Sequence, residues 1–303
     1  MTDAPQTHLD SIFVGFDGSA PSEAALEWAA EQASLEGRPL VLVHAVAPLS
    51  SGAAASLGSL GIDTLRLRED ILADAEALLE RARKRATAGR PDLEVHQMAR
   101  IADPRETLLS LAGEDRLVVV GSRGMGPVRS LLLGSVSLAL TKHASGPVVI
   151  VRPNRAAEAP GDVLVAVALD GTDGPVLDLA FRVASFRGQQ LTVLHCFWDA
   201  SQVSSGSADV PDDEPGLEDL RAQISKLVEA SQAAYPSVPV HLQLARGFVD
   251  ARLLEASRHT GLVVLGHQRK PLLGELVYGS VAPQVVEASA CSVAVVGLAD
   301  PEH

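Results

Sequence analysis

Glycine and serine are concentrated in one stretch whose composition suits the binding of an anion. Residues 121–135 read GSRGMGPVRSLLLGS, with small residues at Gly121, Gly124, Gly126, Gly134 and Ser135. The apolar run 117–120 is typical of a buried parallel strand, and 136–143 predicts a helix that Ser135 caps. Glycine lets the backbone approach a ligand, and a helix N-terminus offers free N–H groups. The stretch predicts a phosphate-binding loop; the alternative is a glycine-rich turn that binds nothing.

Two further polar residues follow expected strands at 12–16 and 40–44. Asp17 comes directly after the first of these runs, and His44 ends the second. Because ligands of parallel sheets bind outside the carboxyl ends of the strands, we expect Asp17, His44 and Gly121 to face one crevice. Asp17 either fixes a ligand or caps the next helix. His44 has no neighbouring pattern of a catalytic triad, so a packing role is expected for it.

The elements that would position these residues alternate between strand and helix. In the first half we expect strands at 12–16, 40–44, 93–100, 117–120 and 148–151, and helices near 21–35, 64–87, 103–111 and 136–143. Residues 50–61 are small and carry no strong signal, so a loop is expected there. Such alternation implies a parallel sheet covered by helices on both faces.

The same pattern restarts after a proline-containing linker at 154–160. Asp170-Gly-Thr172 repeats Asp17-Gly-Ser19, His195 repeats His44, and Gly266 and Gly279 repeat Gly121 and Gly134. An internal duplication explains these matches together. We therefore predict an α/β protein of two tandem doubly wound domains, 1–153 and 161–303. Each would have a five-stranded, mostly parallel sheet with helices on both faces.

The composition excludes several classes of function. A net charge of −13 and an aromatic content of 3% oppose binding to nucleic acid or to an anionic membrane. Cys196 and Cys291 have no metal-ligand spacing and form no disulfide framework, which fits a cytoplasmic protein. No apolar leader or membrane-length segment is expected. Walker, Rossmann, serine-hydrolase and zinc-protease motifs are missing from the sequence, so we assign no catalytic and no metal-ligating residue.

The spacing of Gly121, Gly124, Gly134 and Ser135 resembles the nucleotide-binding pattern of the universal stress protein family. The resemblance covers nearly all of the chain as two copies in tandem, and it implies the adenine-nucleotide alpha hydrolase-like fold. It also implies that ATP binds the first domain, with Mg²⁺ carried on the phosphates. The residues implied to contact the nucleotide are Asp17, Ala45, Gly121, Ser122, Arg123, Gly124, Gly126, Gly134, Ser135, Val136 and Ser137.

These residues divide between the parts of the nucleotide. Backbone donors at 121–126 and 134–137 would hold the phosphates, and the backbone at Ala45 would touch adenine. Arg123 either adds a charge-assisted hydrogen bond to a phosphate or is a solvated loop residue. The second domain is expected to be degenerate, because Arg269 and Pro271 stand where Gly124 and Gly126 do, and proline has no N–H to donate. The alternative is a weaker site, or one for a smaller anion, because Gly266, Gly279 and Ser280 remain and Arg269 and Lys270 could supply charge.

The loop after His195 adds an acidic difference. It carries Asp209, Asp212, Asp213, Glu214, Glu218 and Asp219. This charge opposes a polyphosphate if it lies near the crevice, and it is a solvated surface if it points away.

The resemblance implies a regulatory stress-response protein, an ATP-dependent switch rather than a fast enzyme. Two alternatives stay open: a slow ATPase or self-phosphorylating enzyme, with Ser135 and Ser137 near the γ-phosphate, and a nucleotide-free scaffold. We expect the domains to pair through their last strands, 148–151 and 293–296, as an intramolecular pseudo-dimer. A homodimer and an unidentified regulatory protein partner are further options. The sequence names neither the stress signal nor the physiological ligand.

Overall fold

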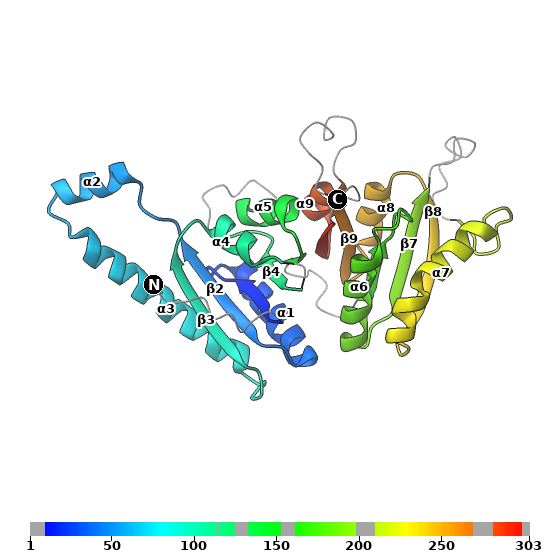
Figure 1. Ribbon diagram of the computed structural model, residues 1–303, viewed down its shortest axis with the longest axis horizontal. Helices are drawn as coiled ribbons and strands as arrows, with labels where there is room; N and C mark the ends of the chain where they lie inside the picture. The colour runs from blue at the N-terminus through cyan, green and yellow to red at the C-terminus, as the bar shows by residue number, and fades with distance from the viewer. Residues whose placement is uncertain are drawn as a thin grey trace. The chain divides into compact units, whose positions relative to one another are not determined.

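The computed structural model describes residues 10–113, 115–124, 133–152, 161–197, 210–268 and 281–298 (Figure 1). Its internal contacts divide the chain into two compact units, Met1–Leu140 and Thr141–His303. Each is an α/β unit whose helices pack on a mainly parallel sheet. The division falls before the strand at 147–151, which was expected to end the first domain. The expected linker at 154–160 lies outside the described residues.

The first unit contains a parallel sheet in the strand order β3-β2-β1-β4. Its elements are β1 (Ile12–Gly15), α1 (Ala20–Glu36), β2 (Leu40–Val46), α2 (Ser51–Ser59), α3 (Thr64–Thr87), β3 (Val95–Ile101), α4 (Pro104–Leu111) and β4 (Leu117–Gly121). Helix α5 (Ser135–His143) begins in this unit and crosses the division. These strands lie within two residues of the positions expected from the sequence.

Helix α1 shows how local signals set the core of this unit. The Ser19 side chain accepts the N–H of Ser22 at the helix start, and Gly37 ends the helix with a left-handed φ of 66°. The buried face of α1 consists mainly of alanines. Small side chains let the helix axis come close to β1 and β4, whose apolar residues are also buried. This close packing fixes the start of α1 beside the end of β4.

The segment between β2 and α3 corrects one expectation. Residues 50–61 were expected to form a loop, but helix α2 occupies Ser51–Ser59, and the Ser50 hydroxyl accepts the Ala53 N–H at 3.2 Å. The serine cap and the alanines explain the helix. No residue of α2 is buried, and Leu65 at the start of α3 is 73% exposed. Helix α3 buries side chains only in its later part, at residues such as Leu79.

The second unit has the strand order β5-β10-β9-β6-β7-β8. Its elements are β5 (Pro147–Val151), β6 (Val163–Ala166), α6 (Gly174–Arg187), β7 (Leu191–Phe197), α7 (Glu218–Ala234), β8 (Val240–Arg246), α8 (Val249–Ala256), β9 (Leu262–Gln268), α9 (Val281–Ala288) and β10 (Ser292–Leu298). Strand β5 is antiparallel to β10, with Val149 opposite Ala294, and the other neighbours are parallel. The expected pairing of 148–151 with 293–296 is confirmed as a strand pair within this unit.

Candidate functional site

The residues expected to face one crevice stand at the carboxyl ends of neighbouring strands in the first unit. Asp17 follows β1, Ala45 lies near the end of β2, and Gly121 ends β4. The chain leaves β1 toward β2 and β3 on one side and returns to β4 on the other. The gap between β1 and β4 is therefore the topological switch point of this sheet, where open α/β sheets bind ligands.

Hydrogen bonds fasten the two ends of the glycine stretch to each other. The Gly134 N–H donates to the Ser122 carbonyl at 2.9 Å, and the Ser137 hydroxyl donates to the Gly121 carbonyl at 2.8 Å. A Cβ at Gly134 would lie 3.3 Å from the Arg123 Cα, so the two ends touch. This arrangement places the N-terminus of α5 beside the end of β4. Gly126 lies outside the described residues.

The start of α5 differs from the expectation in one respect. Ser135 was expected to cap the helix, but α5 already begins at Ser135, and the Gly134 carbonyl accepts the Leu138 N–H at 3.0 Å. Gly134 therefore occupies the capping position. Ser135 is exposed and Val136 is half-buried, so their backbone N–H groups belong to the first turn, where a helix attracts anions.

Two glycines of the stretch are surrounded by different neighbours. A Cβ at Gly121 would lie 2.5 Å from the backbone carbon and oxygen of Pro21, so the packing of β4 on α1 excludes a side chain there. A Cβ at Gly124 would lie 2.5 Å from Oδ2 of Asp17. The Asp17 carboxylate thus lies directly against the backbone of the glycine stretch.

Asp17 and His44 each hold the loop that follows β1. The Ser19 N–H donates to Oδ1 of Asp17 at 3.0 Å, so this oxygen shapes the turn before α1, while Oδ2 is the one nearer Gly124. His44 Nδ1 lies 2.6 Å from the Phe16 carbonyl oxygen. The packing role expected for His44 fits this contact, and the turn role and the ligand role of Asp17 are compatible.

Ser137 and Ser135 differ in what their hydroxyl groups can do. The Ser137 side chain is 3% exposed and its hydroxyl holds the Gly121 carbonyl, so it braces the loop. Ser135 is exposed on the first turn of α5. Arg123 is half-buried beside these groups and brings a positive charge to the loop. Within the described ranges, no group of three or more metal-ligating side chains is found.

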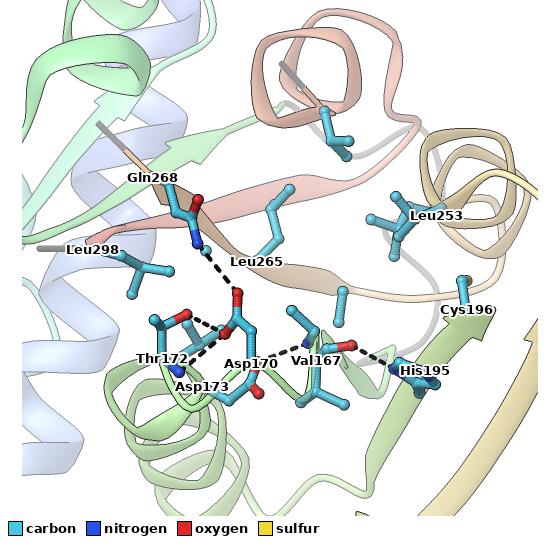
Figure 2. Close-up of a pocket in the computed structure, with 16 residues that line it drawn as sticks. Val167, Asp170, Thr172, Asp173, His195, Cys196, Leu253, Leu265, Gln268 and Leu298 are labelled. Atoms are coloured by element: carbon cyan, nitrogen blue, oxygen red, sulfur yellow. Dashed lines mark hydrogen bonds between the residues drawn. The ribbon is translucent and has the colours of Figure 1, made fainter. Parts of the chain in front are cut away.

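The second repeat contains a cavity of about 420 Å³ at the carboxyl ends of β6, β7 and β9 (Figure 2). Asp170 repeats the turn hydrogen bond of Asp17, because each accepts the N–H of the second residue after it, but the two differ in strand register. His44 bonds Phe16 and His195 bonds Val167, so the residue after Val167 is the counterpart of Asp17, and that residue is Ala168. The motif match is displaced by two residues because the loop after β6 is longer. The sequence contains a signal for the longer loop, because more residues separate β6 from Pro175 than separate β1 from Pro21.

The acidic loop expected after β7 is only partly described. Glu214 forms an ion pair with Arg246 at the end of β8, with Oε2 3.0 Å from Nη1. The described members Asp212, Asp213, Glu218 and Asp219 are exposed, and none of them lines the cavity. Of the two interpretations, the solvated surface fits these positions. Arg269 and Pro271 lie outside the described residues.

Comparison with known proteins identifies the family. The family model described as the universal stress protein family matches residues 8–152 and 161–297. A universal stress protein of Mycolicibacterium smegmatis is 34% identical over 295 residues, covering 94% of this chain and 96% of that protein. Universal stress protein Rv1996 of Mycobacterium tuberculosis is 32% identical over 315 residues, covering 96% of each chain.

The fold agrees with this match. A crystal structure of a universal stress protein from Archaeoglobus fulgidus has a TM-score of 0.62 at 17% identity, covering 95% of this chain and 98% of that one. The chain is thus a tandem α/β protein, and it belongs to the universal stress protein family. Among the helices that the structure describes, none is long and apolar enough to cross a membrane.

Proposed function

We propose that the first repeat binds ATP together with Mg²⁺ and that the protein acts as a nucleotide-dependent regulatory switch. The observation that carries this proposal is the Asp17 carboxylate held against Gly124, at a switch point where the glycine stretch is closed by hydrogen bonds. Packing against Pro21 explains why position 121 is a glycine. At position 124 the neighbouring group is the half-buried carboxylate of Asp17, and a ligand that contacts both the carboxylate and the backbone explains the glycine there.

The proposed contacts follow the chemistry of the described groups. The N–H groups of the first turn of α5 and of the loop after β4 donate to the phosphates, and Arg123 adds charge. The backbone at Ala45 contacts the adenine ring. A carboxylate beside a polyphosphate is repulsive unless a cation lies between them, so Asp17 fits a bound Mg²⁺, directly or through water. The metal would neutralise charge on the phosphates.

A regulatory role is proposed over a fast enzyme because the described loop offers few groups for catalysis. The Ser137 hydroxyl is already engaged with the Gly121 carbonyl, which leaves Ser135 as the exposed hydroxyl of the first turn. A slow ATPase or self-phosphorylating activity at Ser135 is the second candidate. An assay of the purified chain for released phosphate and for label at Ser135 separates the two.

The test begins with native mass spectrometry of the purified chain, which we expect to release an adenine nucleotide. Calorimetry on nucleotide-stripped protein should then show one tight MgATP site per chain. Gly124→Asp and Gly134→Asp should each abolish it, because a carboxylate meets the phosphates. Gly52→Asp is the matched control, because it adds the same charge where nothing lies within 4 Å, and it should bind ATP normally. Unchanged ATP affinity in Gly124→Asp would show that the phosphate loop is wrongly assigned.

A further inference from the structure

The cavity of the second repeat differs in character from a phosphate site. It lies wholly within the second unit, between the carboxyl ends of β6, β7 and β9 and the helices α6 and α8. Most of the side chains that line it are apolar, such as Val176, Leu253, Leu265 and Leu298. Its described lining includes two carboxylates and neither lysine nor arginine. An apolar, negatively charged cavity of about 420 Å³ has the size of a small-molecule site.

The backbone before Asp170 is strained, and a buried carboxylate holds it. Leu169 has a φ of 60°, in the left-handed region that is unfavourable for a residue with a Cβ. Asp173, which is 3% exposed, accepts the N–H groups of Ala168 at 2.7 Å and Leu169 at 2.8 Å. Such strain is unfavourable for folding and is found mostly at binding and active sites. Here it positions Asp170 at the mouth of the cavity.

Asp170 is held as an acceptor by three hydrogen bonds (Figure 2). Oδ1 accepts the Thr172 hydroxyl at 2.6 Å and the Thr172 N–H at 3.0 Å, and Oδ2 accepts Nε2 of Gln268 at 3.1 Å. The hydrogen bond from the Thr172 side chain lowers the pKa of Asp170, so the group is ionised at neutral pH. Oδ2 keeps acceptor capacity for a ligand.

The other end of the cavity is formed by His195 and Cys196. Figure 2 shows His195 and Cys196 together at the end of β7, away from Gln268. Nδ1 of His195 lies 3.0 Å from the Val167 carbonyl oxygen, to which it donates a hydrogen bond. Burial raises the pKa of the Cys196 thiol to about 11, so it is uncharged. Among the described residues that line the cavity, the carboxylates of Asp170 and Asp173 therefore lie on one side of an apolar space.

We propose that this cavity binds a small, largely apolar molecule that carries a primary ammonium group and no phosphate. The ammonium donates to Asp170, and the apolar body lies between Leu265, Val176 and Leu253. An ammonium–carboxylate hydrogen bond is charge-assisted, which makes it stronger than a hydrogen bond between neutral groups. A phosphate would meet the same carboxylate with like charge. The second repeat would thus respond to a different class of ligand from the first.

Two probes that share an indole ring test this assignment by calorimetry on the full chain. Tryptamine carries an ammonium, and indole-3-propionate carries a carboxylate on a similar side chain. We expect tryptamine to bind with one site per chain and at least about tenfold more tightly than the anion, a difference of about 1.4 kcal/mol. Asp170→Asn should remove this preference. Asp219→Asn, which loses the same charge at an exposed position of α7, should keep this preference.

A second variant tests the location. Ala168 is exposed and lines the cavity, so Ala168→Phe should block the mouth and abolish tryptamine binding while the melting temperature stays near that of the parent. Equal affinity for the two probes would overturn the proposal. The proposal would also be overturned if the parent chain did not bind tryptamine, or if folded Asp170→Asn kept the full preference for tryptamine. MgATP binding at the first repeat is measured in the same samples and is independent of each outcome.

Discussion

Gly121 and Gly124 belong to one motif, yet the structure requires each for a different reason. At Gly121 a side chain would meet the backbone of Pro21, which cannot move without shifting α1. At Gly124 it would meet the end of a single side chain, that of Asp17. Gly121 is therefore needed for the packing of the sheet on α1. Gly124 is instead needed for the proposed ligand site between the Asp17 carboxylate and the loop.

Gly121→Ala should destabilise the chain by about 1–3 kcal/mol, because the added methyl group overpacks the contact with Pro21. Urea unfolding followed by circular dichroism measures this. Gly52→Ala is the matched control: it lies in helix α2 with nothing within 4 Å, and it should be neutral or slightly stabilising. Equal stability of the two variants would contradict the packing role of Gly121.

Gly124→Ala should change stability little and should weaken ATP binding strongly. The Asp17 side chain can rotate away, so the cost in unfolding free energy should stay below about 1 kcal/mol, in the range of ordinary surface changes. The displaced carboxylate and the added methyl group would occupy the proposed phosphate site, so MgATP affinity should fall strongly. Calorimetry and urea unfolding on the same sample separate the two effects. A stable variant with normal ATP affinity would count against the proposed site.

Cys196 provides a pH-dependent prediction. Burial raises its thiol pKa from 9.0 to about 11, and Arg252 opposes this only in part. Alkylation by iodoacetamide should therefore be slow in the folded chain at pH 8 and should accelerate toward pH 11, because the thiolate is the nucleophile. The thiol's contribution to stability is present below pH 9.0 and is lost as the pH rises through about 11. Mass spectrometry of the labelled peptide measures the rate; equal rates in buffer and in urea would refute it.

At the scale of elements, helix α2 stands out because it buries none of its side chains. Its contacts are mainly with α3, and Leu60, just after it, is 76% exposed. A short helix without a buried face gains little from packing. Its existence therefore depends on the Ser50 cap and on the helix propensity of its alanines.

We expect backbone amides of α2 to exchange with deuterium orders of magnitude faster than those of α1, which has seven buried residues. Exchange followed by mass spectrometry of peptides from 51–59 and 20–36 makes this comparison within one sample. The same exchange rates measured with MgATP present show whether the nucleotide protects α2. Protection of α2 as strong as that of α1 would mean that a partner or ligand covers it.

At the scale of the whole molecule, the two sequence repeats and the two contact units have different boundaries. Strand β5 comes from the first repeat, but it pairs along four residues with β10 in the second unit. Arg152, just after β5, also donates to the Val286 carbonyl at 2.6 Å. We propose that this pairing ties the repeats into the expected pseudo-dimer.

Val149 and Ala294 lie opposite each other, and both are 0% exposed. Val149→Lys combined with Ala294→Lys should destabilise the second unit by several kcal/mol, because two buried like charges face each other. Val149→Lys with Ala294→Glu should recover part of that loss. Urea unfolding of the single and double variants gives the coupling energy, and light scattering reports any change in association. Equal stability of the Lys/Lys and Lys/Glu chains would contradict the pairing.

Much of this architecture was determined by the sequence alone, because the signals involved are local. Apolar runs such as 117–120 and the spacing of Gly121, Gly124 and Gly134 depend on neighbours only a few residues away. The duplication multiplied these signals, so the fold class and the family followed from them. The same local signals placed Asp17 and His44 at strand ends on one edge of the sheet.

The tertiary structure decided what depends on residues far apart in the chain. Gly121 matches a nucleotide motif, but only the packed structure shows that Pro21 already excludes a side chain there. Asp170 matches Asp17 in sequence, but the strand register assigns the equivalent position to Ala168, because the loop after β6 is longer. The cavity beside Asp170 is formed by residues from 166 to 298. Its shape and charge depend on contacts between residues far apart in the sequence, so no short stretch of sequence could predict them.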